Sequence, residues 1–229
     1  MVSLEYSQRM KSIILVHGAW HGSWCWEFVE SRMIKDGYKV LSVDLPFTGL
    51  DDDAAFLSNI LESMEGEVVL LGHSYGGMVI SKAAEGRGNI SHLVYLCAIL
   101  LEEGATMGGS TDSSQESKIK IDVDENLISI VKRDAVIPAF YEDVDLQIAQ
   151  DSLDLLRPFP IHSVNMGIGE AWRDHPTTYV VCKGDAAIPP DTQRNMSMLA
   201  DRVLEWDCGH SPFFSDPSLI CELLRELVD

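Results

Sequence analysis

The sequence predicts one α/β domain: a doubly wound, mainly parallel sheet of about six strands that carries an inserted helical lid. Three observations support this prediction. Short apolar runs alternate along the chain with amphipathic helical patterns. The runs are almost continuously apolar, as expected for parallel strands that are covered on both faces. The 229 residues are enough to bury a sizeable core in one domain. Strand and helix in alternation are typical of a doubly wound sheet.

The elements are predicted from these patterns in chain order. The strands are Ile13–Val16, Val40–Val43, Val68–Leu71, Leu93–Cys97, Tyr179–Cys182 and, with the weakest pattern, Val203–Trp206. The helices are Trp24–Lys35, Ala54–Met64, Tyr75–Glu85, Thr192–Ala200 and Ser218–Leu227.

One long interval, residues 102–173, interrupts the alternation and separates a first core part, 1–101, from a second, 174–229. The interval shows no convincing strand. A Gly/Ser-rich stretch, Gly104–Ser114, precedes amphipathic segments around Leu127–Lys132 and Val144–Leu156. Because a structureless loop of this length is improbable inside a compact domain, we expect a helical lid.

Composition excludes several classes of protein. The 17 Lys/Arg and 36 Asp/Glu residues give a formal net charge of -19, without a basic cluster, which argues against nucleic acid and anionic membranes as partners. The acidic run Asp51–Asp53 is interpreted as solvated surface. Five cysteines without CxxC spacing favour reduced thiols, mostly in the core. The apolar run Ile13–Val16 is too short for a signal peptide or a membrane span, so we expect a cytoplasmic protein.

The stretch Gly72–Gly76, with the sequence GHSYG, fits the pattern G-x-S-x-G. This pattern arises by chance in roughly 5–10% of chains of this length, so alone it is weak. Here it directly follows a predicted buried strand and opens a predicted helix, the setting that a nucleophilic serine on a tight turn requires. Ser74 is therefore the candidate nucleophile.

A serine nucleophile needs a histidine base that a carboxylate orients. His210 follows the last predicted strand, and Asp185 follows the strand before it, so both lie at the sheet edge where Ser74 emerges. The order Ser74, Asp185, His210 is the order of the α/β-hydrolase triad. Alternative acids are Glu102, Glu103 and Asp207, while the remaining histidines outside the first loop, His73, His92, His162 and His175, are interpreted as structural or exposed.

The loop after the first strand, Val16–Gly22, has the sequence VHGAWHG. Its backbone and that of the residue after the nucleophile can supply an oxyanion hole, with the N–H groups of Ala19 and Tyr75 as donors. His17 and His21 are interpreted as residues that fix the loop. A zinc site is disfavoured because no third ligand has suitable spacing, and the sequence calls for no cofactor.

Together, HGAWHGSWCW, GHSYGGM, Asp185–Pro189 and Gly209–His210 resemble the α/β-hydrolase branch of the plant methyl esterases and hydroxynitrile lyases, and most closely its bacterial esterases. The resemblance extends over nearly the whole chain, including Phe140–Asp143 and Pro189–Arg194. It implies Ser74 as nucleophile, His210 as base and Asp185 as acid, with Ala19 and Tyr75 as oxyanion donors.

Within this branch, the similar cyanohydrin lyases carry a threonine at the position of Gly18 and a lysine at the position of Ser211. Both lyase markers are missing, so the resemblance implies hydrolysis of a small to medium, largely apolar carboxylic ester, for instance a methyl ester. Two alternatives remain open. The first is a triad enzyme of secondary metabolism that acts as a C–C hydrolase, a cyclase or a lyase, and the second is a ligand-binding protein on a hydrolase fold.

The substrate pocket is expected to be apolar, and the partner to be a small-molecule ester. A homodimer is compatible with the sequence. The candidate pocket residues are Gly18, Trp20, Met107, Phe140, Tyr141, Met166 and Phe213.

Overall fold

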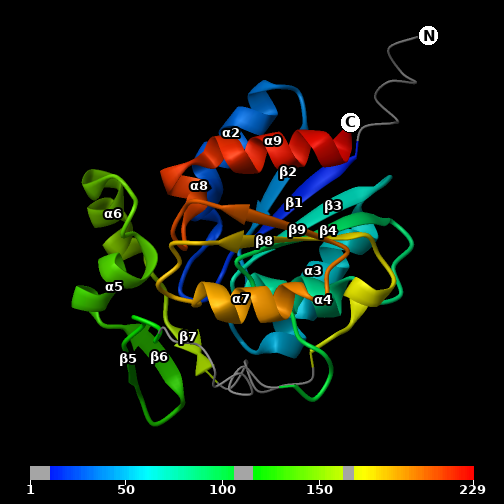
Figure 1. Ribbon diagram of the computed structural model, residues 1–229. Helices are drawn as coiled ribbons and strands as arrows, with labels where there is room; N and C mark the ends of the chain where they lie inside the picture. The colour runs from blue at the N-terminus through cyan, green and yellow to red at the C-terminus, as the bar shows by residue number, and fades with distance from the viewer. Residues whose placement is uncertain (1–10, 106–115, 162–167) are drawn as a thin grey trace.

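The computed structural model describes residues 11–105, 116–161 and 168–229, and its centre is a parallel sheet with strand order β2-β1-β3-β4-β8-β9 (Figure 1). The strands are β1 (Ser12–Val16), β2 (Lys39–Val43), β3 (Val68–His73), β4 (Ile90–Leu96), β8 (Thr177–Cys182) and β9 (Arg202–Trp206). All six predicted strands are present within a few residues of their predicted bounds, which confirms the fold class.

Helices cover both faces of the sheet (Figure 1). The helices α2 (Glu27–Lys35), α8 (Pro212–Ser215) and α9 (Pro217–Val228) lie on one face, and α3 (Leu50–Ser63), α4 (Gly76–Ala83) and α7 (Pro190–Ser197) lie on the other. Short 3₁₀ turns occur at Ser23–Trp26, Leu153–Leu155 and Ala171–Arg173. The helix α7 begins earlier than predicted because Pro190 occupies its first turn, where a missing N–H carries no penalty.

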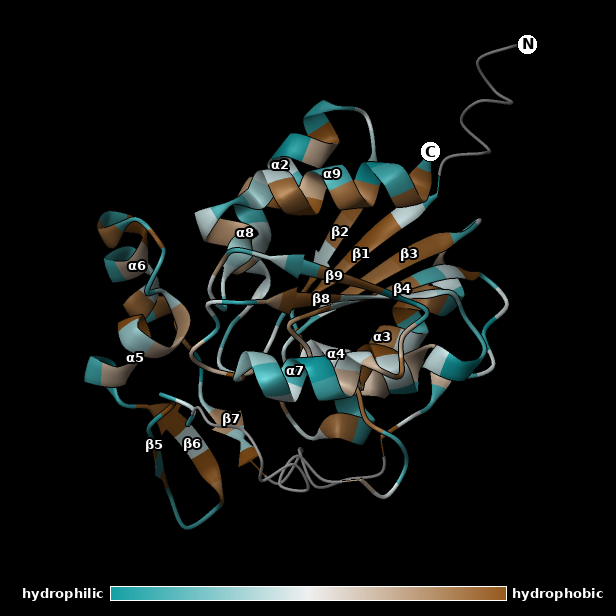
Figure 2. Cartoon of the chain, in the orientation of Figure 1, coloured by the Kyte–Doolittle hydropathy of each residue, from teal (hydrophilic) through white to brown (hydrophobic). Residues whose placement is uncertain are grey.

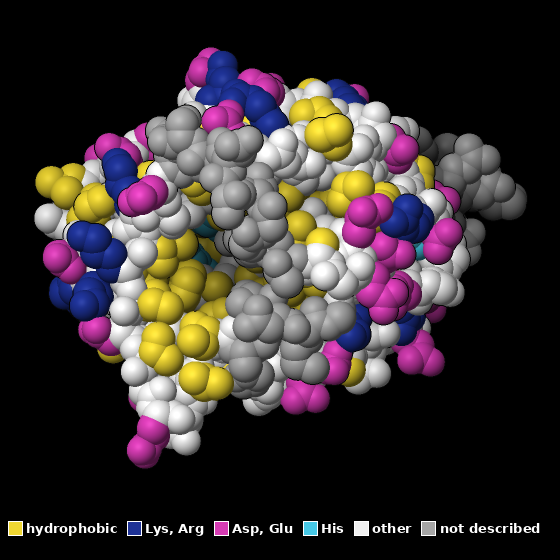
Figure 3. Space-filling view, turned by 60° about the horizontal axis from the view of Figure 1, so that its bottom comes forward, with side chains coloured by type: hydrophobic (Ala, Val, Ile, Leu, Met, Phe, Trp, Pro, Cys, Tyr) yellow, Lys and Arg dark blue, Asp and Glu magenta, His cyan; other side chains and the backbone are white. Residues whose placement is uncertain are grey.

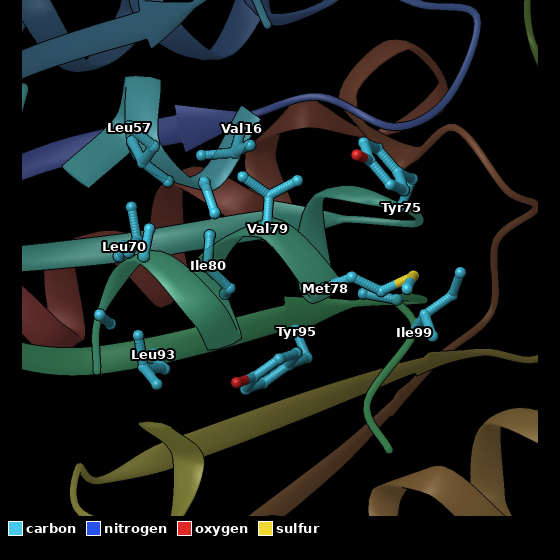
Figure 4. Close-up of a cluster of buried hydrophobic side chains, with 14 of the residues drawn as sticks. Val16, Leu57, Leu70, Tyr75, Met78, Val79, Ile80, Leu93, Tyr95 and Ile99 are labelled. Atoms are coloured by element: carbon cyan, nitrogen blue, oxygen red, sulfur yellow. The ribbon is translucent and has the colours of Figure 1, made fainter. Parts of the chain in front are cut away.

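The core consists of two apolar layers, one on each side of the sheet. Figure 2 shows the central strands as hydrophobic and several covering helices as two-faced. On the α3–α4 side, the side chains of β3 and β4 interlock with those of α4 (Figure 4), where Leu70, Val79 and Leu93 are all fully buried. Continuous burial on both faces explains why these strands show no alternation in the sequence.

The interval 102–173 differs from the purely helical lid that we expected. It contains the helices α5 (Arg133–Phe140) and α6 (Leu146–Ser152), but also an antiparallel sheet of β5 (Ile121–Val123), β6 (Ile128–Val131) and β7 (Phe159–Pro160). The segment Leu127–Lys132 therefore forms mainly a strand. Its β-branched residues favour extended backbone, and Ser129 is buried while Ile130 is 53% exposed, as strand alternation requires.

The strand order places two loops side by side. The chain runs from β1 outward to β2 and then returns to β3 on the other side of β1. Val16 at the end of β1 is paired in register with Gly72 near the end of β3. Ligands bind at such switch points of open α/β sheets, so the loops after β1 and β3 mark the expected site.

Two further expectations concern burial. All five cysteines are free thiols and buried, as the sequence indicated. Of the acidic run, Asp51 and Asp52 are exposed as expected, whereas Asp53 is fully buried, so the surface interpretation is wrong for this residue. Within the described ranges, no helix is both long and apolar enough to cross a membrane.

Candidate active site

Ser74 occupies the turn between β3 and α4 in a left-handed backbone conformation, with φ of 53°. A non-glycine residue in this region is strained and needs neighbouring contacts to hold it. The Ser74 N–H donates to the Leu96 carbonyl at 3.3 Å, and the Ser74 carbonyl accepts the N–H of Ile99 at 3.0 Å. Both contacts come from the end of β4 and its following loop, so the neighbouring strand fixes the turn.

Two glycines allow the loops around Ser74 to approach closely. A Cβ at Gly76 would lie 2.7 Å from the Val16 carbonyl oxygen, and a Cβ at Gly18 would lie 2.8 Å from the Ser74 Cβ. Neither position can accept a side chain without movement of its neighbours. The absence of these two side chains lets the loop after β1 lie directly against Ser74.

Asp185 and His210 are brought together, and both are buried with 3% exposure. The His210 Nδ1 lies 2.7 Å from Oδ2 of Asp185. The other carboxylate oxygen accepts the N–H groups of Ala187 at 2.7 Å and Ile188 at 2.9 Å. The carboxylate is thus oriented by the loop that follows β8, and it can hold the His210 ring with Nδ1 protonated.

His73 connects the His210 loop to the turn that bears Ser74. Its Nε2 lies 2.8 Å from the His210 carbonyl oxygen, so Nε2 carries the proton and donates it. The ring centroids of His73 and His210 are 4.6 Å apart. Complete burial lowers the pKa of His73 well below its usual value, so it stays neutral. The expected packing role of His73 agrees with this geometry.

His17 and His21 fix the loop after β1, as expected. His17 Nε2 accepts the Leu45 N–H at 3.0 Å, and its Nδ1 donates to the Gly18 carbonyl at 2.9 Å. The Nδ1 of His21 donates to the Ala19 carbonyl at 2.9 Å. Burial lowers the pKa of His17 to about 4 and that of His21 to about 3, so both rings are neutral at ordinary pH and keep these bonds.

A cavity of about 480 Å³ opens at Ser74. Its wall is largely apolar and contains no charged side chain among the described residues; it is formed by Ala19, Trp20, Ser74, Tyr75, Ile99, Ser117, Ile119, Ile121, Phe159, Ile161, Ala187, Ile188, Pro189 and Thr192. Figure 3 shows apolar side chains gathered around a hollow on the face that the view brings forward.

The predicted pocket residues are only partly in this wall. Trp20 lines the cavity, whereas Phe140, Tyr141 and Phe213 are buried and absent from its wall. Gly18 packs against Ser74 and does not line the cavity either. Met107 and Met166 lie outside the described residues. Phe140, Tyr141 and Phe213 were misplaced because composition identifies them as apolar without showing which apolar surface they join.

Two polar residues that support the site were not predicted. Gln193 is fully buried and donates Nε2 to Oδ2 of Asp185 at 2.8 Å. Asp53 accepts the Tyr75 hydroxyl at 2.8 Å and the Phe47 N–H at 2.8 Å, which accounts for its burial. The position of Gln193 beside the Pro-rich start of α7 was part of the family resemblance, but nothing in the sequence showed its partner.

The insertion is hydrogen-bonded to the loops of the core. The Arg157 N–H donates to the Trp20 carbonyl at 2.7 Å, and the Trp20 indole N–H donates to Ser129 at 3.0 Å. On the side of the loop that bears Asp185, the Lys118 N–H donates to the Ala186 carbonyl at 2.7 Å. The described residues of the insertion are therefore joined to the loops of the site on both sides.

In the described part of the chain, one group of three residues has the composition of a metal site: His73, Cys97 and His210, all buried. His73 is engaged with the His210 carbonyl, and His210 with Asp185. The Cys97 thiol also points to the His210 carbonyl oxygen, at 3.5 Å. These bonds give His73 and Cys97 a structural role beside His210.

Comparisons with known proteins agree with the fold. The model of the alpha/beta hydrolase family matches residues 13–223. The alpha/beta hydrolase nvfD of Aspergillus novofumigatus is 27% identical over 93% of this chain and 95% of its own length. Methylesterase 3 of Arabidopsis thaliana is 26% identical over 99% of each chain. The crystal structure of a pyrethroid hydrolase from Sphingobium faniae JZ-2 superposes with a TM-score of 0.82, at 22% identity over 96% of this chain and 97% of that one. The chain belongs to the alpha/beta hydrolase family.

Proposed function

We propose that this protein is a serine hydrolase that cleaves a largely apolar carboxylic ester through an acyl-enzyme. The observation that carries the proposal is the strained Ser74 turn, which opens into an apolar cavity and is linked through His73 to the paired His210 and Asp185. A methylesterase among the relatives supports the ester class.

In the proposed reaction, the Ser74 hydroxyl attacks the ester carbonyl while His210 accepts its proton through Nε2. Asp185 stabilises the resulting imidazolium, and the proton then goes to the leaving alkoxide. Water repeats the sequence to release the acid from Ser74. Of the described groups, none accepts the Ala19 N–H, which leaves it available as an oxyanion donor. The second donor that we assign is the N–H of Tyr75, the residue after the nucleophile.

The cavity supports a neutral substrate. An ionised group on the ester would lose its hydration on entry and find no opposite charge in the described wall. Gly18 and Ser211 support hydrolysis over cyanohydrin cleavage, because the similar lyases carry a threonine and a lysine at these positions. Five unpaired thiols fit a reducing compartment and support a cytoplasmic location.

The test is a panel of p-nitrophenyl and methyl esters, assayed with the wild type, Ser74→Ala and His210→Ala. Removal of either side chain is expected to lower kcat by about 10⁴–10⁶-fold. Ser63→Ala, a change to an exposed serine on α3, serves as the control and is expected to retain activity. Substantial ester turnover by Ser74→Ala would contradict the proposal. A stoichiometric release of product without further turnover would indicate a binding protein instead.

A further inference from the structure

The chain that leaves α5 contacts both loops that flank Ser74. The Tyr141 hydroxyl donates to Nε2 of His21 at 2.8 Å, and Oδ2 of Asp143 accepts the N–H of Gly209 at 2.6 Å. His21 belongs to the loop after β1, and Gly209 directly precedes His210. Two residues of the insertion, separated only by Glu142, thus bind the loop after β1 and the loop that bears His210.

The Tyr141 contact reaches the backbone of Ala19. The Ala19 carbonyl oxygen can only accept, so Nδ1 of His21, 2.9 Å away, carries the ring proton and donates it. This leaves Nε2 of His21 to accept the Tyr141 hydroxyl proton. Tyr141 and His21 are each 1% exposed, so water does not compete for these bonds. A chain of two hydrogen bonds therefore runs from the insertion to the residue whose N–H we assign to the oxyanion hole.

The Asp143 contact fixes the backbone beside the base. A Cβ at Gly209 would lie 2.5 Å from Oδ1 of Asp143, so the carboxylate lies directly against this peptide. A hydrogen bond between a carboxylate and a backbone N–H is stronger than one between neutral groups. Asp143 therefore restrains the peptide that leads into His210.

Phe140 fills the space between the same two loops. Its ring centroid lies 5.4 Å from that of His21 and 5.6 Å from that of His210. The residues Phe140, Tyr141 and Asp143 together form what we call the α5 clamp. No member of the clamp lines the cavity at Ser74.

We propose that Tyr141 and Asp143 are positioning residues that hold the Ala19 N–H and the His210 ring in register with Ser74. This inference rests on the proposed hydrolase function. Since the clamp is outside the cavity wall, its loss acts on alignment in the transition state and leaves binding of the neutral substrate unchanged. A small displacement of catalytic groups is sufficient to slow a reaction considerably.

The test compares Tyr141→Phe and Asp143→Ala with a matched control, Glu142→Gln. Glu142 lies between the two clamp residues but is exposed and pairs with Lys118 at the surface. Titration of Ser74 with a fluorophosphonate gives the concentration of folded sites, so that kcat is measured per active site. Each clamp variant is expected to lose roughly 10- to 100-fold in kcat with KM within about twofold. Glu142→Gln keeps both constants.

Two further readouts separate positioning from damage to the fold. The inhibition constant of a trifluoromethyl ketone, which mimics the tetrahedral intermediate, is expected to rise in parallel with the loss of kcat/KM. Asp143→Asn retains an acceptor oxygen for the Gly209 N–H and is expected to recover most of the activity. An unchanged inhibition constant, or equal kcat values for Asp143→Asn and Asp143→Ala, would overturn the role of the clamp.

The two proposals fail differently. If the wild type turns over esters and Ser74→Ala does not, while Tyr141→Phe and Asp143→Ala match Glu142→Gln, the clamp is refuted and the hydrolase function stands. If Ser74→Ala matches the wild type, the proposed function fails first, and the clamp fails with it.

Discussion

Gln193 and His210 share one oxygen of Asp185: the Gln193 Nε2 lies 2.8 Å from Oδ2, and the His210 Nδ1 lies 2.7 Å from it. The Gln193 amide is itself oriented by the Cys182 N–H, which donates to its Oε1 at 2.9 Å. The direction of the carboxylate is therefore fixed from the end of β8 through a neutral, fully buried side chain.

Gln193→Leu is expected to lower kcat by about 10-fold, because Asp185 loses the donor that aligns it with His210. The change also leaves the buried Cys182 N–H without its acceptor, which costs about 1–3 kcal/mol of unfolding free energy. Ester kinetics and urea denaturation measure the two effects. The control is Arg194→Gln, which changes the residue directly after Gln193. The exposed side chain of Arg194 forms an ion pair with Glu205. Wild-type kcat in Gln193→Leu would refute this role.

Gly18→Ala is expected to reduce kcat/KM on the order of 10²-fold and unfolding free energy by about 1–3 kcal/mol. The new Cβ would lie 2.8 Å from the Ser74 Cβ and 2.9 Å from Nδ1 of His73, so the loop that bears Ala19 must move away. Gly88→Ala introduces the same methyl group where no atom lies within 4 Å and is expected to be neutral. Equal kinetics for the two variants would show that the loop tolerates the displacement.

Ile119→Asp is expected to raise KM for neutral esters by at least about 10-fold, while kcat changes much less. Ile119 lines the cavity and is partly exposed, so the variant should fold, but its carboxylate would lose hydration when an apolar ester enters. Leu146→Asp places the same charge on a side chain that is 62% exposed and outside the cavity wall. A KM shift of equal size in both variants would place the binding site elsewhere.

Stability is expected to fall as the pH is lowered from about 6.5 toward 4. Burial lowers the pKa of His17 to about 4 and of His21 to about 3, from 6.5 in the unfolded chain. Between these values the unfolded state binds more protons than the folded state, so each histidine contributes a slope of up to about 1.4 kcal/mol per pH unit. Urea denaturation between pH 7 and 4 measures the slope.

The slope should become shallower in His21→Asn, which removes one of the buried histidines whose pKa is lowered. Ser63→Ala, a change to an exposed serine on α3, removes no histidine and should leave the slope as in the wild type. An identical slope in the wild type and His21→Asn would mean that His21 is not the source of the acid sensitivity.

The central strands β1, β3, β4 and β8 could be predicted because they are largely buried on both faces, so local composition alone reveals them. The edge strands β2 and β9 alternate between partly buried and exposed residues, and β9 accordingly had the weakest pattern in the sequence. The same reasoning placed Ser74, Asp185 and His210 at one edge of the sheet, and the structure joins Asp185 to His210 there. The short strands of the insertion were missed because only three, four and two residues form β5, β6 and β7, too few to show a period.

The polar supports of the site could not be predicted for a different reason. The burial of Asp53 depends on its contact with Tyr75, 22 residues away, and the role of Gln193 depends on the position of Asp185 across a turn. In the sequence, an acidic run and a glutamine in a polar helix are typical of surface. Tyr141 was assigned to the pocket because the sequence indicates that it is buried, but the sequence does not show where its hydroxyl points.

The bonds between the insertion and the loops after β1 and β9 also limit how new specificities can arise in this chain. Replacement of residues 102–173 by the equivalent segment of a relative would exchange part of the cavity wall, but it would also remove the partners of Trp20, His21 and Gly209. A functional chimera must therefore inherit Tyr141 and Asp143, or their counterparts, together with the loops that they bind. In this chain, the residues that set the selectivity of the cavity and those that align the reacting groups must therefore be exchanged together.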